Sequence, residues 1–176
     1  MVTVQEVVDA FEYFYANLLD QEYARSTHYA FYNEQELLPL TRAFLLGYFA
    51  DEMRAEHWST LPGCPTKYGR IDFVVGGVAV ELAVRHRGGA KASLLPQVNA
   101  TEVKKLLCWS GKAVLILLDF DSNHLDVEDI KKYRELPSLG KGNWKKSPFN
   151  VAYMYQIKKP KVVNLIRRRI RARRLT

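Results

Sequence analysis

The stretch that decides the fold reads YGRIDFVVGGVAVELAVR and spans residues 68–85. Two runs of mostly apolar residues flank Gly76 and Gly77, and paired glycines supply the positive φ angles of a two-residue hairpin turn. The sequence therefore predicts an antiparallel β-hairpin. Its two strands carry one carboxylate each, Asp72 and Glu81, and the turn brings them into the same region.

Carboxylates in such an apolar hairpin need a partner. Burying an unpaired carboxylate is costly, and a hard cation such as Mg²⁺ is one partner that two converging acids can bind. Alternation also places Glu81 on the same strand face as Ala83 and Arg85. The alternative interpretation is therefore a surface hairpin on which Asp72 is solvated and Glu81 pairs with Arg85.

The segments after the hairpin predict a mixed α/β core in one domain, residues 1–176. Residues 97–109 place apolar and polar side chains on opposite faces of an amphipathic helix. Residues 113–120 are almost continuously apolar, which predicts a strand covered on both faces. A short charged helix over 125–136 and a last strand over 149–157 follow.

This order of elements resembles the PD-(D/E)XK nuclease superfamily over about residues 33–120. The resemblance implies a restriction-endonuclease-like core, with a mixed β-sheet of about four to five strands flanked by helices. It also implies that Asp72 and Glu81 bind Mg²⁺ or Mn²⁺. A lysine two residues after the glutamate assists the attacking water in that family, and Ala83 occupies its position here.

Three side chains could supply the missing positive charge. Arg85 lies one strand repeat further along the same face, and Lys104 and Lys105 lie on the polar face of the following helix. A lysine would reproduce the missing charge, whereas an arginine stays protonated and can orient a phosphate. Without any of them, the alternative is a nuclease fold that has lost cleavage and kept nucleic-acid binding.

Family members also tend to carry an acidic residue on the first core helix. Asn33 can cap a helix over residues 34–49, and Glu36 is the best match to that acid, with Glu34 second. The helix dipole alone favours acids in a first turn, so a purely structural role is the alternative.

Basic residues gather towards the C-terminus, which indicates nucleic acid as the partner, with DNA favoured over RNA. From residue 131 onward there are fifteen Lys and Arg against one acid, whereas the rest has eleven against eighteen. The extension over 158–176 predicts a basic helix that begins after Pro160. Cations can hold phosphates and an aromatic can stack on a base. The candidate contacts are Trp144, Lys145, Lys146, Lys161, Arg167, Arg168 and Arg171.

The remaining features bound the class of protein. Residues 3–20 predict an amphipathic helix that packs in the core. No apolar run approaches the roughly 20 residues of a membrane span, and the start lacks a signal-peptide pattern. We expect an intracellular protein of the cytoplasm or nucleoid with no membrane partner. A homodimer is the alternative to a monomer, because in nucleases that cut both strands two-fold symmetry places two active sites.

Overall fold

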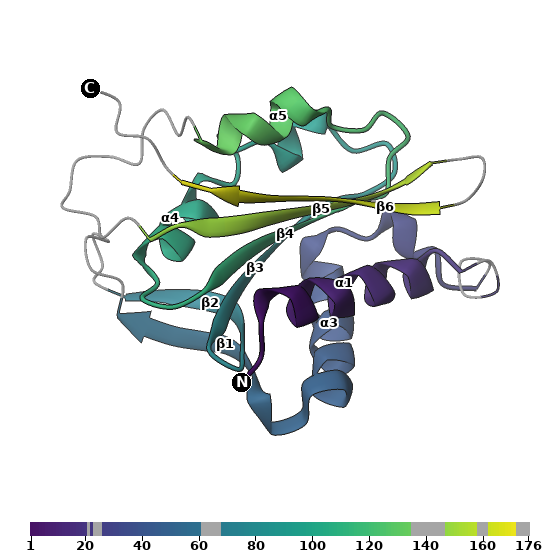
Figure 1. Ribbon diagram of the computed structural model, residues 1–176. Coiled ribbons are helices and arrows are strands. Elements are labelled where there is room, and N and C mark those ends of the chain that lie inside the picture. Colours follow the sequence, from purple (N-terminus) through teal and green to yellow (C-terminus); the bar gives the residue numbers. More distant parts are fainter. Residues whose placement is uncertain (21, 23–25, 61–67, 135–146, 158–161, 172–176) are drawn as a thin grey trace.

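The computed structural model describes residues 1–20, 22, 26–60, 68–134, 147–157 and 162–171 (Figure 1). In this part of the chain, six strands form one sheet in the order β1-β2-β3-β4-β5-β6. The three central strands are parallel to one another, and the outer pairs are antiparallel. The strands are β1 (Met53–Thr60), β2 (Tyr68–Val75), β3 (Val78–Arg85), β4 (Ala113–Asp119), β5 (Phe149–Ile157) and β6 (Val162–Ile170). The predicted α/β class and mixed sheet are confirmed, with more strands than the four to five expected.

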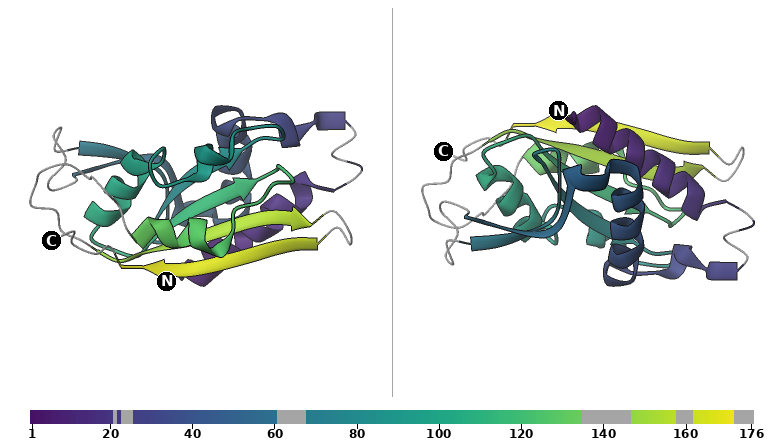
Figure 2. Two further views of the ribbon diagram at one scale, coloured as in Figure 1. Left: turned by 90° about the horizontal axis from the view of Figure 1, so that it is seen from above. Right: turned by 90° about the horizontal axis from the view of Figure 1, so that it is seen from below.

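Helices cover both faces of this sheet (Figures 1 and 2). α1 (Val4–Leu18) and α3 (Glu34–Phe49) pack with one hydrophobic cluster, and α4 (Ala100–Cys108) and α5 (Val127–Lys131) pack with the other. β4 runs between these layers and is buried throughout, as its apolar sequence predicts. Short 3-10 turns occupy Tyr29–Phe31, Ala50–Glu52, Lys91–Leu94 and Lys132–Arg134.

The predicted N-terminal helix is confirmed, and its apolar stripe lies in the core. Thr3 and Glu6 form a capping box at the start of α1, which satisfies backbone N–H groups that have no partner within the helix. Its buried side chains include Val7, Val8 and Phe11 at helical spacing.

The predicted basic C-terminal helix is wrong, because residues 162–170 form the edge strand β6. β6 pairs antiparallel with β5, from Val162↔Ile157 to Ile170↔Phe149. Its apolar side chains alternate: Val163 and Leu165 pack on the α1 side, and Ile166 and Ile170 pack on the α4 side. Pairing with the open edge of β5 and burial on both faces outweigh the helical pattern.

The sheet is irregular where Glu56 and Asp72 lie. Glu56 has a φ of 49°, which an L side chain rarely adopts. Phe73 packs on the α1 side, yet Ile71, two residues earlier, packs on the α4 side, so alternation in β2 is interrupted at Asp72. The β2–β3 register runs from Val75↔Val78 to Phe73↔Val80 and ends just before Asp72.

Candidate functional site

Asp72, Glu81 and Lys105 meet where the β2–β3 ladder ends. Asp72 Oδ2 accepts a hydrogen bond from the backbone N–H of Leu82 at 3.0 Å. Glu81 is fully buried, and its Oε2 accepts a hydrogen bond from Lys105 Nζ at 2.7 Å. The other oxygen, Glu81 Oε1, is buried and accepts no hydrogen bond from the described residues. This carboxylate is therefore only half satisfied.

A pocket of about 630 Å³ opens beside Asp72 and Lys105. Side chains from α3, β1, β2 and α4 line it, with four acids and three bases among them. They are Glu34, Gln35, Leu38, Pro39, Arg42, Ala55, Glu56, Arg70, Asp72, Phe73, Glu102 and Lys105. Glu81 is fully buried and is not part of this lining; its hydrogen bond with Lys105 joins it to a residue that is.

Burial raises the pKa of the carboxyls around Lys105. The pKa of Glu81 lies well above its usual value, chiefly because of burial and then because of the charge on Asp72. Burial also raises the pKa of Asp72, although the Leu82 N–H, Lys105 and hydrogen bonding with the Glu81 side chain oppose the change. The pKa of Glu34 rises to about 7 through burial and the charges of Asp72 and Glu102. An added positive charge would stabilise all these anions.

Lys105 stays protonated in this environment. Burial alone would lower its pKa, but Glu81, Asp72 and Glu102 outweigh burial and raise it. Ala83, two residues after Glu81 on β3, is 1% exposed and packs in the cluster under α4. Lys105 on α4 therefore supplies the positive charge beside Glu81 that Ala83 on β3 does not.

Glu36, Arg85 and Lys104 lie outside this pocket. The exposed Glu36 accepts a hydrogen bond from the Asn33 backbone N–H at 2.7 Å in the capping box of α3, and Glu34, the second choice, lines the pocket instead. Arg85 is buried at the other end of β3 and forms a two-hydrogen-bond ion pair with Asp119. Lys104 is partly exposed.

The sequence reasoning missed four charged residues of the pocket: Arg42, Glu56, Arg70 and Glu102. Glu102 could have been predicted from the sequence, because a residue three positions before Lys105 shares its helix face. Glu56 could not, since it lies on β1, a strand that the sequence pattern did not predict.

The predicted phosphate contacts divide into two sets. Arg167 and Arg168 are exposed on β6, and Arg171 is exposed just beyond it. Trp144, Lys145, Lys146 and Lys161 lie outside the described residues.

Asp72 and Glu81 fit a divalent cation by charge and by the unsatisfied Glu81 Oε1. In the described ranges, no three His, Cys, Asp or Glu side chains form a group that could hold a metal ion. Mg²⁺ usually binds to one or two carboxylates and takes its other ligands from water and substrate phosphates. Two carboxylates are therefore a sufficient protein contribution for that ion.

Within the residues that the structure describes, no helix is both long and apolar enough to cross a membrane. Comparison with known proteins finds no matching family model, no matching curated protein and no matching solved structure.

Proposed function

We propose that this chain is a metal-dependent nuclease that hydrolyses phosphodiester bonds in DNA. The observation that supports the proposal is the meeting of Asp72, Glu81 and Lys105 beside one pocket, with a buried carboxylate oxygen left unsatisfied. The resemblance to the PD-(D/E)XK superfamily implies two acids and a lysine of this kind. Lys105 takes the role of the lysine that is absent at Ala83.

Asp72 and Glu81 would hold Mg²⁺ or Mn²⁺. When bound, such an ion stabilises negative charge on the phosphate and lowers the pKa of a bound water. Lys105, protonated and hydrogen-bonded to Glu81, holds a positive charge where charge develops on the reacting phosphate. The ion and Lys105 together would balance the anions that burial now destabilises.

Glu34 is the candidate general base. Its pKa of about 7 places it near the pH at which proton transfer is most efficient. It lines the same pocket as Asp72 and comes from α3, whereas Lys105 comes from α4. Arg42 and Arg70 in the lining can orient phosphate oxygens through their planar guanidinium groups.

The decisive experiment titrates Mn²⁺ into the full chain with labelled single-stranded, duplex and branched DNA and with single-stranded RNA. Wild type is compared with Asp72→Asn and Lys105→Met, and Glu36→Gln is the matched control, because Glu36 caps a helix outside the pocket. We expect cleavage to be lost in the first two variants and kept in the control.

Two results would contradict the proposal. Full cleavage by Asp72→Asn would show that Asp72 does not hold a catalytic metal ion. Binding of DNA by wild type without cleavage under any condition would favour the alternative, a nuclease-fold protein or subunit that binds nucleic acid and no longer cuts it.

A further inference from the structure

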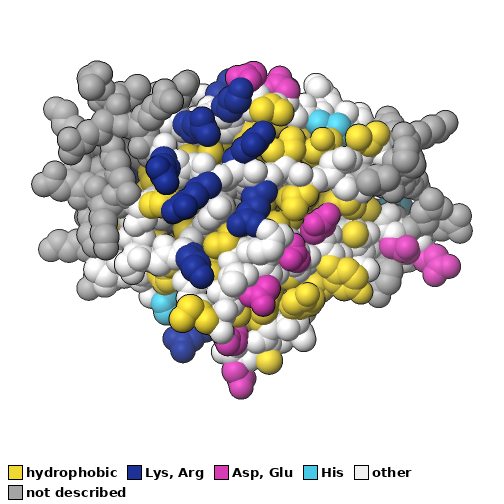
Figure 3. Space-filling view, in the orientation of Figure 1, with side chains coloured by type: hydrophobic (Ala, Val, Ile, Leu, Met, Phe, Trp, Pro, Cys, Tyr) yellow, Lys and Arg dark blue, Asp and Glu magenta, His cyan; other side chains and the backbone are white. Residues whose placement is uncertain are grey.

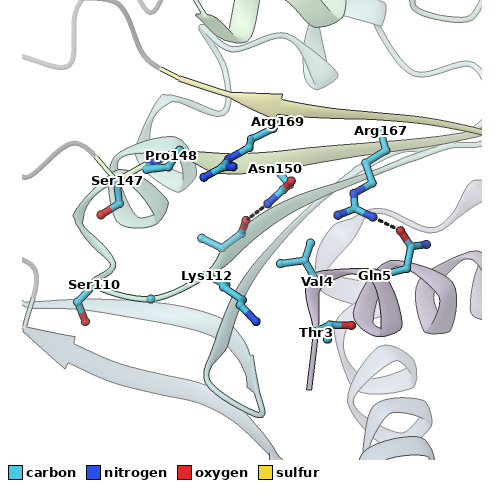
Figure 4. A pocket seen from close by; sticks show the side chains of 12 residues that line it. Thr3, Val4, Gln5, Ser110, Lys112, Ser147, Pro148, Asn150, Arg167 and Arg169 are labelled. Atoms are coloured by element: carbon cyan, nitrogen blue, oxygen red, sulfur yellow. Dashed lines mark hydrogen bonds between the residues drawn. The ribbon is translucent and has the colours of Figure 1, made fainter. Parts of the chain in front are cut away.

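A second pocket, of about 650 Å³, lies on the α1 side of the sheet and differs in charge from the candidate active site. It is bounded by the start of α1, the loop into β4, the start of β5 and the end of β6 (Figure 4). Its lining contains Lys112, Arg167 and Arg169 and no acidic residue. We call this pocket the basic groove.

The three cations of the basic groove come from two separate parts of the chain. Lys112 precedes β4, whereas Arg167 and Arg169 lie two residues apart on β6 and therefore share one face of that strand. In the described part of the chain, none of the three belongs to an ion pair. Figure 3 shows Lys and Arg side chains gathered in a band across this face.

Neutral polar groups hold the groove in shape. Arg167 Nη1 donates a hydrogen bond to Gln5 Oε1 of α1, and Asn150 Nδ2 donates to the Ala113 carbonyl at 3.1 Å (Figure 4). The Glu6 carboxylate accepts hydrogen bonds from the Thr3 backbone N–H and Oγ1, which lower its pKa most, and the charge of Lys112 lowers that pKa further. Among the described residues, no salt bridge engages Lys112 or the two arginines, and a ligand would compete with Glu6 for Lys112.

We infer that the basic groove binds the phosphodiester backbone of a nucleic-acid strand. Guanidinium groups two residues apart on a strand, about 6.6 Å, can contact successive phosphates of one extended backbone. The groove has cations from two elements, Lys112 before β4 and the two arginines on β6, which suits a chain of phosphates better than one isolated anion. Arg169 and Lys112 were not among the contacts predicted from the sequence, so the folded structure adds them.

The groove adjoins the hairpin that carries the candidate active site. Trp109 Nε1 donates a hydrogen bond to the Gly77 carbonyl at 3.3 Å, and the Ala79 N–H donates to the Lys112 carbonyl at 2.9 Å. Asp72 lies four residues along β2 from Gly76, or about 13 Å. The inference rests on the proposed nuclease function in one respect only, that the strand held here is the one presented to Asp72.

The test measures binding in EDTA, so that its outcome does not depend on cleavage. A groove variant, Lys112→Gln with Arg167→Gln and Arg169→Gln, is compared with wild type by fluorescence anisotropy, using labelled single-stranded and duplex DNA. The matched control removes the same charge elsewhere: Lys131→Gln with Arg134→Gln and Arg54→Gln. All three side chains are exposed and line neither pocket, and circular dichroism checks that each variant is folded.

Loss of three phosphate contacts should lower the slope of log Kd against log salt by about 2 for single strands. Affinity at moderate salt should fall at least about tenfold, and the control should change less. Equal losses in both variants would overturn the inference in favour of net charge alone, and an unchanged groove variant would overturn it outright. So would a groove that binds anionic phospholipid vesicles and not DNA.

Cleavage is scored separately with Mn²⁺ present. Groove-dependent binding by a wild type that never cleaves would uphold the basic groove and contradict the nuclease. Cleavage by a wild type whose binding does not depend on the groove would contradict the basic-groove inference and support the nuclease.

Discussion

Arg85 with Asp119 is a buried ion pair and Lys105 with Glu81 is a partly buried one. Both involve β3, and Glu81 and Arg85 lie four residues apart on that strand. The first pair is completely hydrogen-bonded. Asp119 Oδ1 accepts from Arg85 Nε at 2.7 Å and from the Asp121 N–H at 3.0 Å. Asp119 Oδ2 accepts from Arg85 Nη2 at 2.6 Å and from Tyr153 Oη at 2.5 Å.

The second pair is incomplete. Glu81 accepts one hydrogen bond, from Lys105, and its Oε1 is buried without a partner among the described residues. Asp72 and Glu102 add negative charge that raises the pKa of Glu81 further. The same kinds of residue thus stabilise the Arg85 end of β3 and leave Glu81, in the middle of the strand, short of positive charge. Carboxyls whose pKa is raised in this way cluster at functional sites.

Asp119→Asn should have the largest effect on stability. The change leaves the buried Arg85 without its counter-charge, and breaking such a pair costs about 3–5 kcal/mol. Urea denaturation at pH 7 measures the loss. A loss below about 1 kcal/mol would show that the pair is not the anchor of this end of the sheet.

Glu81→Gln makes the same isosteric change in the incomplete pair and should behave oppositely. The pKa of Glu81 is higher in the folded than in the unfolded chain, so its ionisation destabilises the fold as pH rises through the folded value. At pH 8 we expect the variant to be as stable as wild type or up to about 1 kcal/mol more stable, with cleavage abolished. A destabilisation as large as that of Asp119→Asn would remove the contrast between the pairs.

Glu34→Gln should change the pH dependence of stability. With a folded pKa of about 7 against an ordinary value of 4.5, Glu34 contributes stability below pH 4.5, and this contribution is lost as pH rises to 7. The variant should lose less stability than wild type across this window, by on the order of 1 kcal/mol after allowance for partial exposure. Urea denaturation at pH 4.5 and pH 8 measures this difference between the two proteins. An equal change in stability between the two pH values in wild type and variant would contradict the assigned pKa.

Local sequence patterns predicted much of the fold. The hairpin, β4, α1 and α3 follow from alternation, helical spacing and a cap within a few residues of each element. β6 was mistaken for a helix because its partner β5 is what makes it a strand. β1 was missed because it alternates between half-buried and exposed residues after Met53, so its apolar signal is weak.

The candidate site shows the same division between local and tertiary information. Asp72 and Glu81 follow from the hairpin itself. The choice between Glu34 and Glu36 depends on which face of α3 packs inward, and the buried Leu37, Thr41 and Leu45 put Glu34 on that side. The choice of Lys105 over Lys104 depends on how α4 is rotated against β3, which only the folded chain reveals.

Glu36→Gln should have the smallest effect and separates the two acids of α3. Glutamine can still accept the hydrogen bond from the Asn33 N–H, so the capping box weakens without disappearing. We expect a loss of about 0.5 kcal/mol, no change in the pH slope that Glu34 governs, and unchanged cleavage. Thermal unfolding and the cleavage assay with Mn²⁺, run beside Glu34→Gln, measure both. Loss of cleavage in Glu36→Gln with full helix stability would move the catalytic acid of α3 from the pocket to the cap, and the pocket would lose its candidate base.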